Sequence, residues 1–357
     1  MAVKEAKPGG KPPAGGNPPA GNPPAGGPPR HDPKVIKALT RFAISISVFN
    51  IVGYLFLGFE QPWIWVFVAI ATAYTTEVVF ETIGARVEGR DPRYRGRGLK
   101  GWIEFLLPAH ITAIAVNMLI YVNDRIWVMI FAVTLAVATK WILRAPVRGK
   151  LRHYMNPSNF GIMMVLVLFP WGSIAPPYHF TEGLNDWGSW ILPGIIIIGG
   201  TMLNAKLTGR MWLIMGWVGV FALQAVVRGV LFDTAITSSL LVMTGVAFIL
   251  YTNYMVTDPG TTPSKPGAQF AFGGGVAVVY AFFMIVHVAY GLFFATAIVC
   301  GIRGMFLWGL HFVNKARVKA EEEQKAKENE LVEPTDVEAP KVAAVPDDGE
   351  RARPAAA

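Results

Sequence analysis

The chain has 357 residues, of which 53% are hydrophobic and only 16% are charged, and its formal net charge is +8. This composition is too apolar for a soluble domain of this length and predicts an integral membrane protein whose first partner is the lipid bilayer. A single cysteine, Cys300, excludes an internal disulfide and any multi-cysteine metal or iron–sulfur site. Basic loops beside a membrane explain the positive charge, so we expect no nucleic-acid partner.

The two ends of the chain differ in composition from the middle. Residues 1–33 are dominated by glycine, proline, alanine and lysine, which predicts a disordered tail without a cleavable signal sequence. Residues 314–357 are charged and rich in alanine and proline; the stretch KARVKAEEEQKAKENELVE is expected to extend the last helix, and the rest to be disordered. The transmembrane domain is therefore predicted over 34–313.

The middle of the chain contains recurrent apolar segments, each about long enough to cross roughly 30 Å of hydrocarbon. Strand-like alternation is absent, and lipid cannot satisfy free backbone groups, so the predicted fold class is an all-α membrane protein. The ten predicted spans are 41–59, 63–84, 102–122, 126–144, 158–173, 188–206, 211–231, 235–256, 268–286 and 288–312.

Basic residues gather in alternate connectors, which predicts the orientation of the spans. The connectors after the second, fourth and sixth spans and the C-terminal flank carry the positive charge, whereas the other connectors contain only Arg125 and Arg228. We therefore expect a multi-pass protein of the inner (plasma) membrane with both termini in the cytoplasm.

Ionisable residues inside the predicted spans are costly to bury and are candidates for function. Glu77 and Glu81 lie four residues apart on one helix face, and Arg303 of the last span is expected at a depth similar to that of Glu77. A Glu77–Arg303 pair would be either a structural ion pair or part of a polar pathway. His110 is expected to be a hydrogen-bonded core histidine.

Two connectors combine asparagine or aspartate with proline, a pattern that starts a turn and can cap a helix. They are tight turns, or else they hold an anion such as a flavin phosphate at a helix N-terminus. No nucleotide-binding, metalloprotease or hydrolase signature occurs, so no catalytic residue is assigned. The candidate cofactor-binding residues are Asn156, Ser158, Asn159, Asp258, Thr261 and Thr262.

The segments HYMNPSNFGIMMVLVLFPW (153–171) and YMVTDPGTTPSKPGAQFAFG (254–273) resemble the RnfD/NqrB family of integral membrane proteins. The family consists of subunits of ion-translocating, electron-transferring complexes. The resemblance covers about residues 40–312 and implies ten helices in a channel-like bundle of two inverted five-helix repeats, with other membrane redox subunits as partners.

The chain departs from the family where its covalently bound FMN is attached. The loop 172–190 lacks the flavin-linking motif. The sequence DTAIT at 233–237 is only weakly similar to that motif, so covalent FMN on Thr237 is not expected. The pattern looks closer to the RnfD-like proteins of enediyne biosynthesis gene clusters, which lack the flavin motif. A non-covalent flavin remains compatible with the sequence.

Three functions follow from these observations. The first is membrane electron transfer, with a flavin or a quinone, in a redox or natural-product pathway. The second is a transporter or channel-like protein for a small molecule or ion. The polar residues inside the predicted spans favour this function. The third is a membrane scaffold that holds biosynthetic enzymes through its tails.

Overall fold

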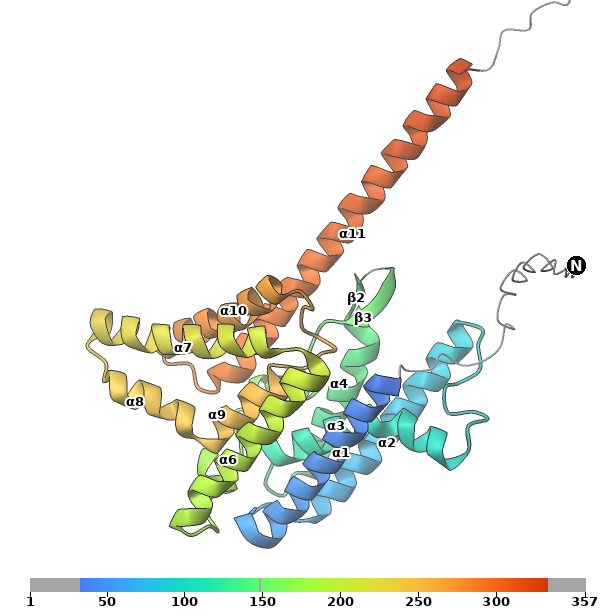
Figure 1. Cartoon of the computed structure of the whole chain (residues 1–357). Coiled ribbons are helices and arrows are strands. Elements are labelled where there is room, and N and C mark those ends of the chain that lie inside the picture. Colours follow the sequence, from blue (N-terminus) through green and yellow to red (C-terminus); the bar gives the residue numbers. More distant parts are fainter. Residues whose placement is uncertain (1–32, 148, 333–357) are drawn as a thin grey trace, which may run out of the picture. The chain divides into compact units, whose positions relative to one another are not determined.

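The computed structural model describes residues 33–147 and 149–332 (Figure 1). The tail predicted over 1–33 therefore lies outside the described residues except for Pro33, and so does the C-terminal stretch 333–357. The chain divides into two compact units, the first ending at Leu307 and the second beginning at Trp308.

Helices make up nearly all regular structure of the first unit. Several of them end in short π-helical or 3-10 segments, which are labelled η. In chain order the helical elements are α1 (Pro33–Val52), η1 (Gly53–Leu57), α2 (Ile64–Val87), α3 (Gly98–Leu119), α4 (Ile126–Ile142), α5 (Pro157–Leu168), η2 (Pro177–Phe180), α6 (Asp186–Leu203), η3 (Asn204–Thr208), α7 (Met211–Phe232), α8 (Ile236–Leu241), η4 (Val242–Thr244), α9 (Val246–Leu250), η5 (Tyr251–Met255), α10 (Pro266–Ile285) and the start of α11 (Gly291–Val332).

The lengths of the apolar helices confirm an all-α, multi-pass membrane protein. Among the described residues, seven helices are long and apolar enough to cross a bilayer, and an eighth span results if the bent pair Ile236–Thr244 and Val246–Met255 is counted as one. Helices α4 and α5 have 17 and 12 residues. They rise by only about 26 and 18 Å, less than the hydrocarbon core. The count of ten spans stays a prediction, as does the inverted repeat.

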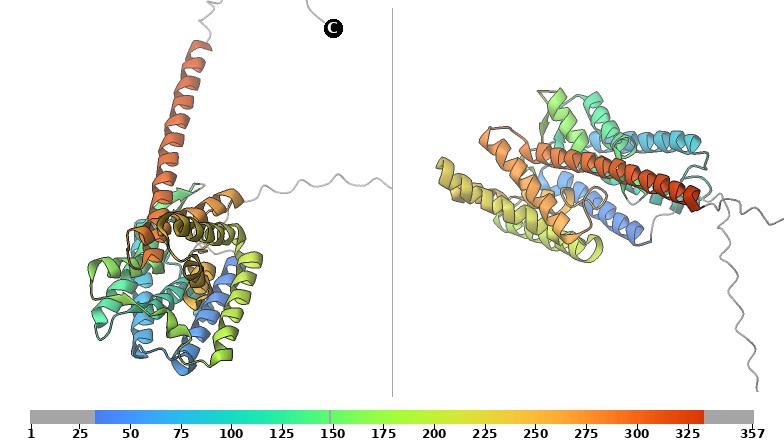
Figure 2. Two further views of the ribbon diagram at one scale, coloured as in Figure 1. Left: turned by 90° about the vertical axis from the view of Figure 1, so that its left-hand side faces the viewer. Right: turned by 90° about the horizontal axis from the view of Figure 1, so that it is seen from above.

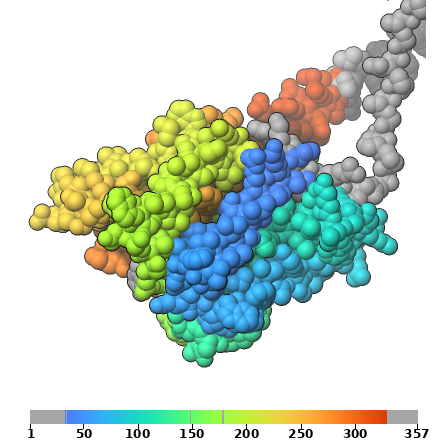
Figure 3. All heavy atoms as spheres, turned by 60° about the horizontal axis from the view of Figure 1, so that its bottom comes forward, coloured from blue at the N-terminus to red at the C-terminus, as the bar shows by residue number. Residues whose placement is uncertain are grey.

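The outer surfaces of the long helices carry apolar side chains, as expected for contact with lipid. In the view of Figure 3, the atoms of α1 and α6 lie next to each other on the surface. Both helices expose large aliphatic residues between 54% and 64%: Ile44, Val48 and Ile51 on α1, and Ile191, Ile195 and Ile198 on α6. A surface of this kind is stable in a hydrocarbon environment and would be a liability in water.

Helices α7 and α10 run side by side in Figures 1 and 2, and glycines bring their backbones together. A β-carbon on Gly216 would lie 2.3 Å from the carbonyl oxygen of Phe270, and one on Gly273 would lie 2.3 Å from that of Leu213. Small residues permit close approach of membrane helices. The glycine-lined start of α10 thus packs tightly against α7.

Two short antiparallel strand pairs join the helix ends, and the sequence analysis missed both. Strand β1 (Ile120–Tyr121) pairs with β4 (Ser173–Ile174), and β2 (Arg144–Val147) pairs with β3 (Lys150–His153) as a hairpin. Gly149 has φ +77°, which suits the hairpin turn. Strands of two to four residues leave too little alternation to be recognised in a sequence.

The ends of α6 and α9 unwind into π-helical turns and meet there. The amide of Asn204 donates to the carbonyl oxygens of Gly200 at 2.9 Å and of Asn253 at 2.8 Å, so it links η3 to η5. The α8–η4 and α9–η5 halves are bent by 63°. Irregular helical turns expose backbone groups, and buried asparagines satisfy them here.

The second unit is described from Trp308 to Val332, where α11 continues as a charged, exposed helix. Arg317 and Glu321 form an ion pair at 3.1 Å, and Lys319 and Glu323 form one at 3.5 Å, each with an i,i+4 spacing. Such pairs support a solvated helix. The prediction that the charged stretch extends the last helix is confirmed.

Candidate functional site

The predicted acidic pair on α2 organises the basic loop that follows this helix. Glu81 is fully buried, and its carboxylate accepts hydrogen bonds from both terminal nitrogens of Arg90, at 2.6 and 3.4 Å, and from the backbone N–H and Nε of Arg93, both at 2.7 Å. Glu88 also pairs with Arg90. The two carboxylates raise the pKa of Arg90 above its ordinary value.

Glu77 forms ion pairs with residues other than the one expected. Its carboxylate lies 2.9 Å from Nζ of Lys140 on α4 and 3.7 Å from a terminal nitrogen of Arg93. The expected Glu77–Arg303 pair is therefore wrong. Lys140, near the end of α4 that leads into the β2–β3 hairpin, takes the place expected for Arg303. A similar predicted depth in the membrane is not enough to bring two side chains together. The pairs connect α2, α4 and the basic loop, which agrees with the structural interpretation.

His110 is a hydrogen-bonded histidine inside the helical bundle, as expected. Its Nε2 lies 2.8 Å from the hydroxyl of Ser47 on α1, and its Nδ1 lies 2.9 Å from the hydroxyl of Tyr74 on α2. Both ring nitrogens are thus used to connect three helices. Arg303 is half-buried on α11, on the side of the bundle where Arg210 and Cys300 lie.

The two connectors that carry the predicted cofactor residues lie against each other. Asn156 caps α5 by accepting from the backbone N–H of Asn159 at 3.0 Å, and its amide donates to the carbonyl oxygen of Met255 at 2.9 Å. Ser158 donates to the same Asn156 oxygen at 3.1 Å. The amide of Asn159 reaches the carbonyl oxygen of Phe293 at the start of α11. The capping predicted from NPSN is therefore present, and it ties α5 to two distant segments.

The Asp258 turn is closed by its own hydrogen bonds. The carboxylate accepts from the backbone N–H of Gly260 at 3.0 Å and from the hydroxyl of Thr261 at 3.1 Å. The Asp258 carbonyl oxygen accepts from the hydroxyl of Thr262 at 2.6 Å. We call this turn, together with the Asn156 cap, the connector junction. All six candidate cofactor residues fall within it, so the structure brings them together.

Two basic side chains from outside the spans complete the connector junction. A β-carbon on Gly260 would lie 2.7 Å from Nε2 of His153, so this turn approaches the hairpin closely. Removal from water lowers the pKa of the His153 imidazole, and nearby Asp258 only partly opposes this. Arg210 donates to the carbonyl oxygen of Pro259 at 3.2 Å, and its burial lowers its pKa as well.

The residues of the connector junction do not fit a flavin phosphate in this arrangement. A phosphate would need free N–H and O–H donors. Here the donors of Asn159, Ser158, Gly260 and Thr261 are directed to the side chains of Asn156 and Asp258. The contacts therefore agree with the interpretation as tight turns. Thr237, the remaining threonine considered for a covalent flavin, is exposed on α8.

A cavity of about 430 Å³, which we call the aromatic cavity, lies where α10 ends and α11 begins. Most of its lining is apolar, and its polar groups come from Tyr280, His287 and Tyr290. His287 and Tyr290 have φ of +58° and +59°. Residues other than glycine rarely adopt this backbone conformation, and strained residues of this kind cluster at functional sites.

Sequence reasoning missed several of these residues. Arg93 was considered only as a contributor to loop charge, and Lys140, which lies inside the predicted span 126–144, was not considered. Asn204 and Asn253 carry no motif. The connector HVAYG at 287–291 offered no signal except its position between two spans. The spacing of residues in a sequence shows which side chains share one helix face or one turn. It does not show which side chains of two different elements come into contact.

No group of three or more histidine, cysteine, aspartate or glutamate side chains that could hold a metal occurs within residues 33–147 and 149–332. In comparisons with known proteins, no family model matches the chain, and no curated protein matches it significantly.

Proposed function

We propose that the chain is a multi-pass membrane protein of the RnfD/NqrB type that takes part in membrane electron transfer by binding a lipid-soluble quinone. The proposal includes ten spans in a channel-like bundle, with both termini in the cytoplasm. The resemblance of residues 153–171 and 254–273 supports it, and so does the hydrogen bond by which Asn156 of the first segment binds Met255 of the second.

The observation that carries the proposal is the aromatic cavity. Its volume of about 430 Å³ is within the range of small-molecule sites, which are mostly apolar with a few placed polar groups. A quinone ring is flat and apolar and has two carbonyl acceptors. Tyrosine hydroxyls and an imidazole N–H are suitable donors to them, and Tyr280, His287 and Tyr290 line the cavity.

The position of the cavity suits a ligand that arrives from the bilayer. The last two residues of α10, Met284 and Ile285, and Val286 directly after it are apolar and exposed, at 36%, 41% and 46%. In this proposal, two electrons from a partner redox subunit and two protons convert the quinone into a quinol. The residues of this chain bind and orient the carrier.

A titration of the detergent-purified protein with a short-chain quinone tests the proposal. Saturable quenching of tryptophan and tyrosine fluorescence is expected. His287→Leu and Tyr280→Phe should each weaken binding by about five- to ten-fold, because each removes one hydrogen-bond donor to a quinone carbonyl. His311→Leu, which changes an exposed histidine of α11 outside the cavity, is the matched control. Absence of saturation, or equal affinity in all variants, would contradict the proposal.

A second candidate function is transport of a small molecule or ion. The 63° bend between α8–η4 and α9–η5 favours it, because transporters build their sites from discontinuous helices. The ion-paired carboxylate of Glu77 would then belong to a polar pathway. If Glu77→Gln leaves transport unaffected, and also leaves unaffected the resistance of a producing cell to its own natural product, this mechanism is excluded.

A further inference from the structure

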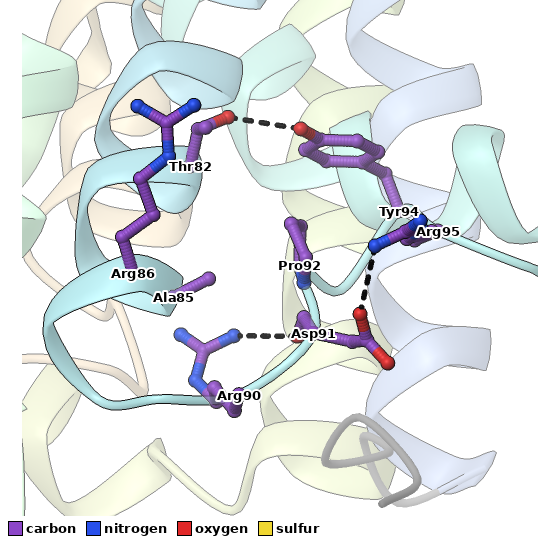
Figure 4. Close-up of a pocket in the computed structure, with 8 residues that line it drawn as sticks. All are labelled: Thr82, Ala85, Arg86, Arg90, Asp91, Pro92, Tyr94 and Arg95. Atoms are coloured by element: carbon purple, nitrogen blue, oxygen red, sulfur yellow. Dashed lines mark hydrogen bonds and ion pairs between the residues drawn. The ribbon is translucent and has the colours of Figure 1, made fainter.

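A second cavity, which we call the basic cavity, lies between the end of α2 and the loop that follows it (Figure 4). Its volume is about 400 Å³. Figure 4 shows three guanidinium groups spaced around it, with a tyrosine and a threonine hydroxyl on one side. The lining residues are Thr82, Ala85, Arg86, Arg90, Asp91, Pro92, Tyr94 and Arg95.

The charges around the basic cavity are only partly compensated. Glu81 and Glu88 pair with Arg90, and Asp91 pairs with Arg95 at 3.1 Å. Among the residues that the structure describes, no ion pair engages Arg86. Residues 84–101 contain six basic and two acidic side chains, so the surroundings keep an excess of positive charge.

The loop holds its shape without a ligand. Glu81 fixes the backbone at Arg93 through a hydrogen bond of 2.7 Å, and the hydroxyls of Thr82 and Tyr94 lie 2.9 Å apart. Thr82 and Arg86 are one turn apart on α2, so they share a helix face. Donors that are held in place before binding lose little freedom when an anion binds.

Apolar side chains beside the basic cavity place it next to lipid. Ile83 and Val87 of α2 are 52% and 83% exposed, and Leu99 and Ile103 of α3 are 78% and 54% exposed. Arginines that sit beside apolar surface at the end of a membrane span lie at the depth of lipid headgroups. The same side chains offer contacts for the first carbons of an acyl chain.

We propose that the basic cavity binds a phosphate group, with Arg86 and Arg95 as its main cationic contacts. The Thr82 hydroxyl donates to the carbonyl oxygen of Val78 at 2.6 Å and lies 2.9 Å from the hydroxyl of Tyr94, so these two side chains shape the wall of the cavity. Arginine recognises phosphate oxygens through paired N–H groups, which suits both charge and geometry. The headgroup of an anionic phospholipid and a soluble phosphate ester share this chemistry, and the adjacent apolar surface favours the lipid.

The experiment measures binding to the full-length, detergent-purified chain by native mass spectrometry. The probes are a short-chain phosphatidylglycerol, the matching phosphatidylcholine, and glycerol 3-phosphate. Selective retention of phosphatidylglycerol is expected. Arg86→Gln and Arg95→Gln should each weaken it about five-fold, the effect of one basic residue near an anionic headgroup. Arg317→Gln, an exposed arginine with one surface ion pair, should leave it unchanged.

Each outcome bears on the proposal. Binding of glycerol 3-phosphate with the same dependence on Arg86 and Arg95, and without phosphatidylglycerol, would identify a soluble phosphate ester as the ligand. Equal retention of phosphatidylglycerol and phosphatidylcholine, or equal affinities in the wild type and all variants, would overturn the phosphate site. Arg86→Lys keeps the charge and should keep part of the binding. Unchanged thermal midpoints show that the variants fold.

Discussion

Glu81 is the residue on which the basic loop depends. It is fully buried and accepts four hydrogen bonds from Arg90 and Arg93. Glu81→Gln should lower the free energy of unfolding by about 3 kcal/mol, because removing one partner of a buried pair leaves the other charges uncompensated. Reversible unfolding in mixed micelles measures this change.

The matched control for Glu81 lies seven residues further along the chain. Glu88 also pairs with Arg90, at 2.5 Å, but its side chain is 52% exposed. Glu88→Gln should therefore change the free energy of unfolding by less than about 1 kcal/mol. Equal effects of the two substitutions would show that burial of Glu81 does not anchor the loop.

His179 makes stability depend on pH. It is buried and stacks on Phe59 with ring centroids 3.8 Å apart, and burial lowers its pKa to about 4. The unfolded chain, with an ordinary value of about 6.5, binds more protons between these pH values. The free energy of unfolding should therefore contain the full contribution of the neutral ring above pH 6.5. It should decrease by about 3 kcal/mol as the pH is lowered to 4.

The difference between the wild type and His179→Gln isolates this contribution, because other titrating groups are common to both chains. The free energies of unfolding of the two proteins are measured at a series of pH values from 4 to 7.5. The difference between them should become smaller as the pH is lowered. A constant difference over the whole range would mean that the imidazole of His179 has the same pKa in the folded and the unfolded chain.

At the scale of elements, the close contact of α7 and α10 depends on glycine. Gly216→Ala or Gly273→Ala should lower the free energy of unfolding by about 1–3 kcal/mol, because an added methyl group would overlap a backbone carbonyl of the facing helix. A β-carbon on Gly219 of α7 would meet no atom within 4 Å. Gly219→Ala is the control and should be neutral or slightly stabilising. If all three alanines behave alike, α7 and α10 do not pack through their glycines.

Asn156 joins two connectors, and its loss should cost more than the loss of a cap. Asn156→Ala removes both the α5 cap and the bond to Met255, for an expected loss of about 2–3 kcal/mol. Asn185→Ala removes only the cap of α6, a bond of 2.8 Å to Gly188, and should cost about 1 kcal/mol. Chemical unfolding of both variants compares them. Equal losses would mean that the Asn156–Met255 bond adds nothing.

The sequence predicted the position of the helices well and their partners poorly. Long apolar segments determine where helices such as α2 and α7 lie, because length and hydropathy are local properties. The cap at Asn156 was also local and therefore predictable. The pairing of Glu77 with Lys140 was not, because it depends on how α2 and α4 pack, and similar depth in a membrane does not fix rotation about a helix axis.

At the scale of the whole molecule, polar groups that stabilise the fold and polar groups that could bind a ligand lie in different places. The connector junction uses its donors within the protein, so the NPSN and TDPG motifs act together in joining two connectors. The aromatic cavity, lined by Tyr280 and His287, and the basic cavity, lined by Arg86 and Arg95, are where donors remain for ligands. No sequence motif marked either cavity, since each is assembled from a helix end and the loop beside it.

Photolabelling shows directly whether a quinone binds in the aromatic cavity. An azidoquinone is irradiated with the full-length protein, and the modified peptide is identified by mass spectrometry. Labelling is expected within residues 280–293, the range that contains most of the lining of the aromatic cavity, and excess unlabelled quinone should protect against it. Labelling confined to the connector junction, or labelling that excess quinone does not reduce, would contradict quinone binding in the aromatic cavity.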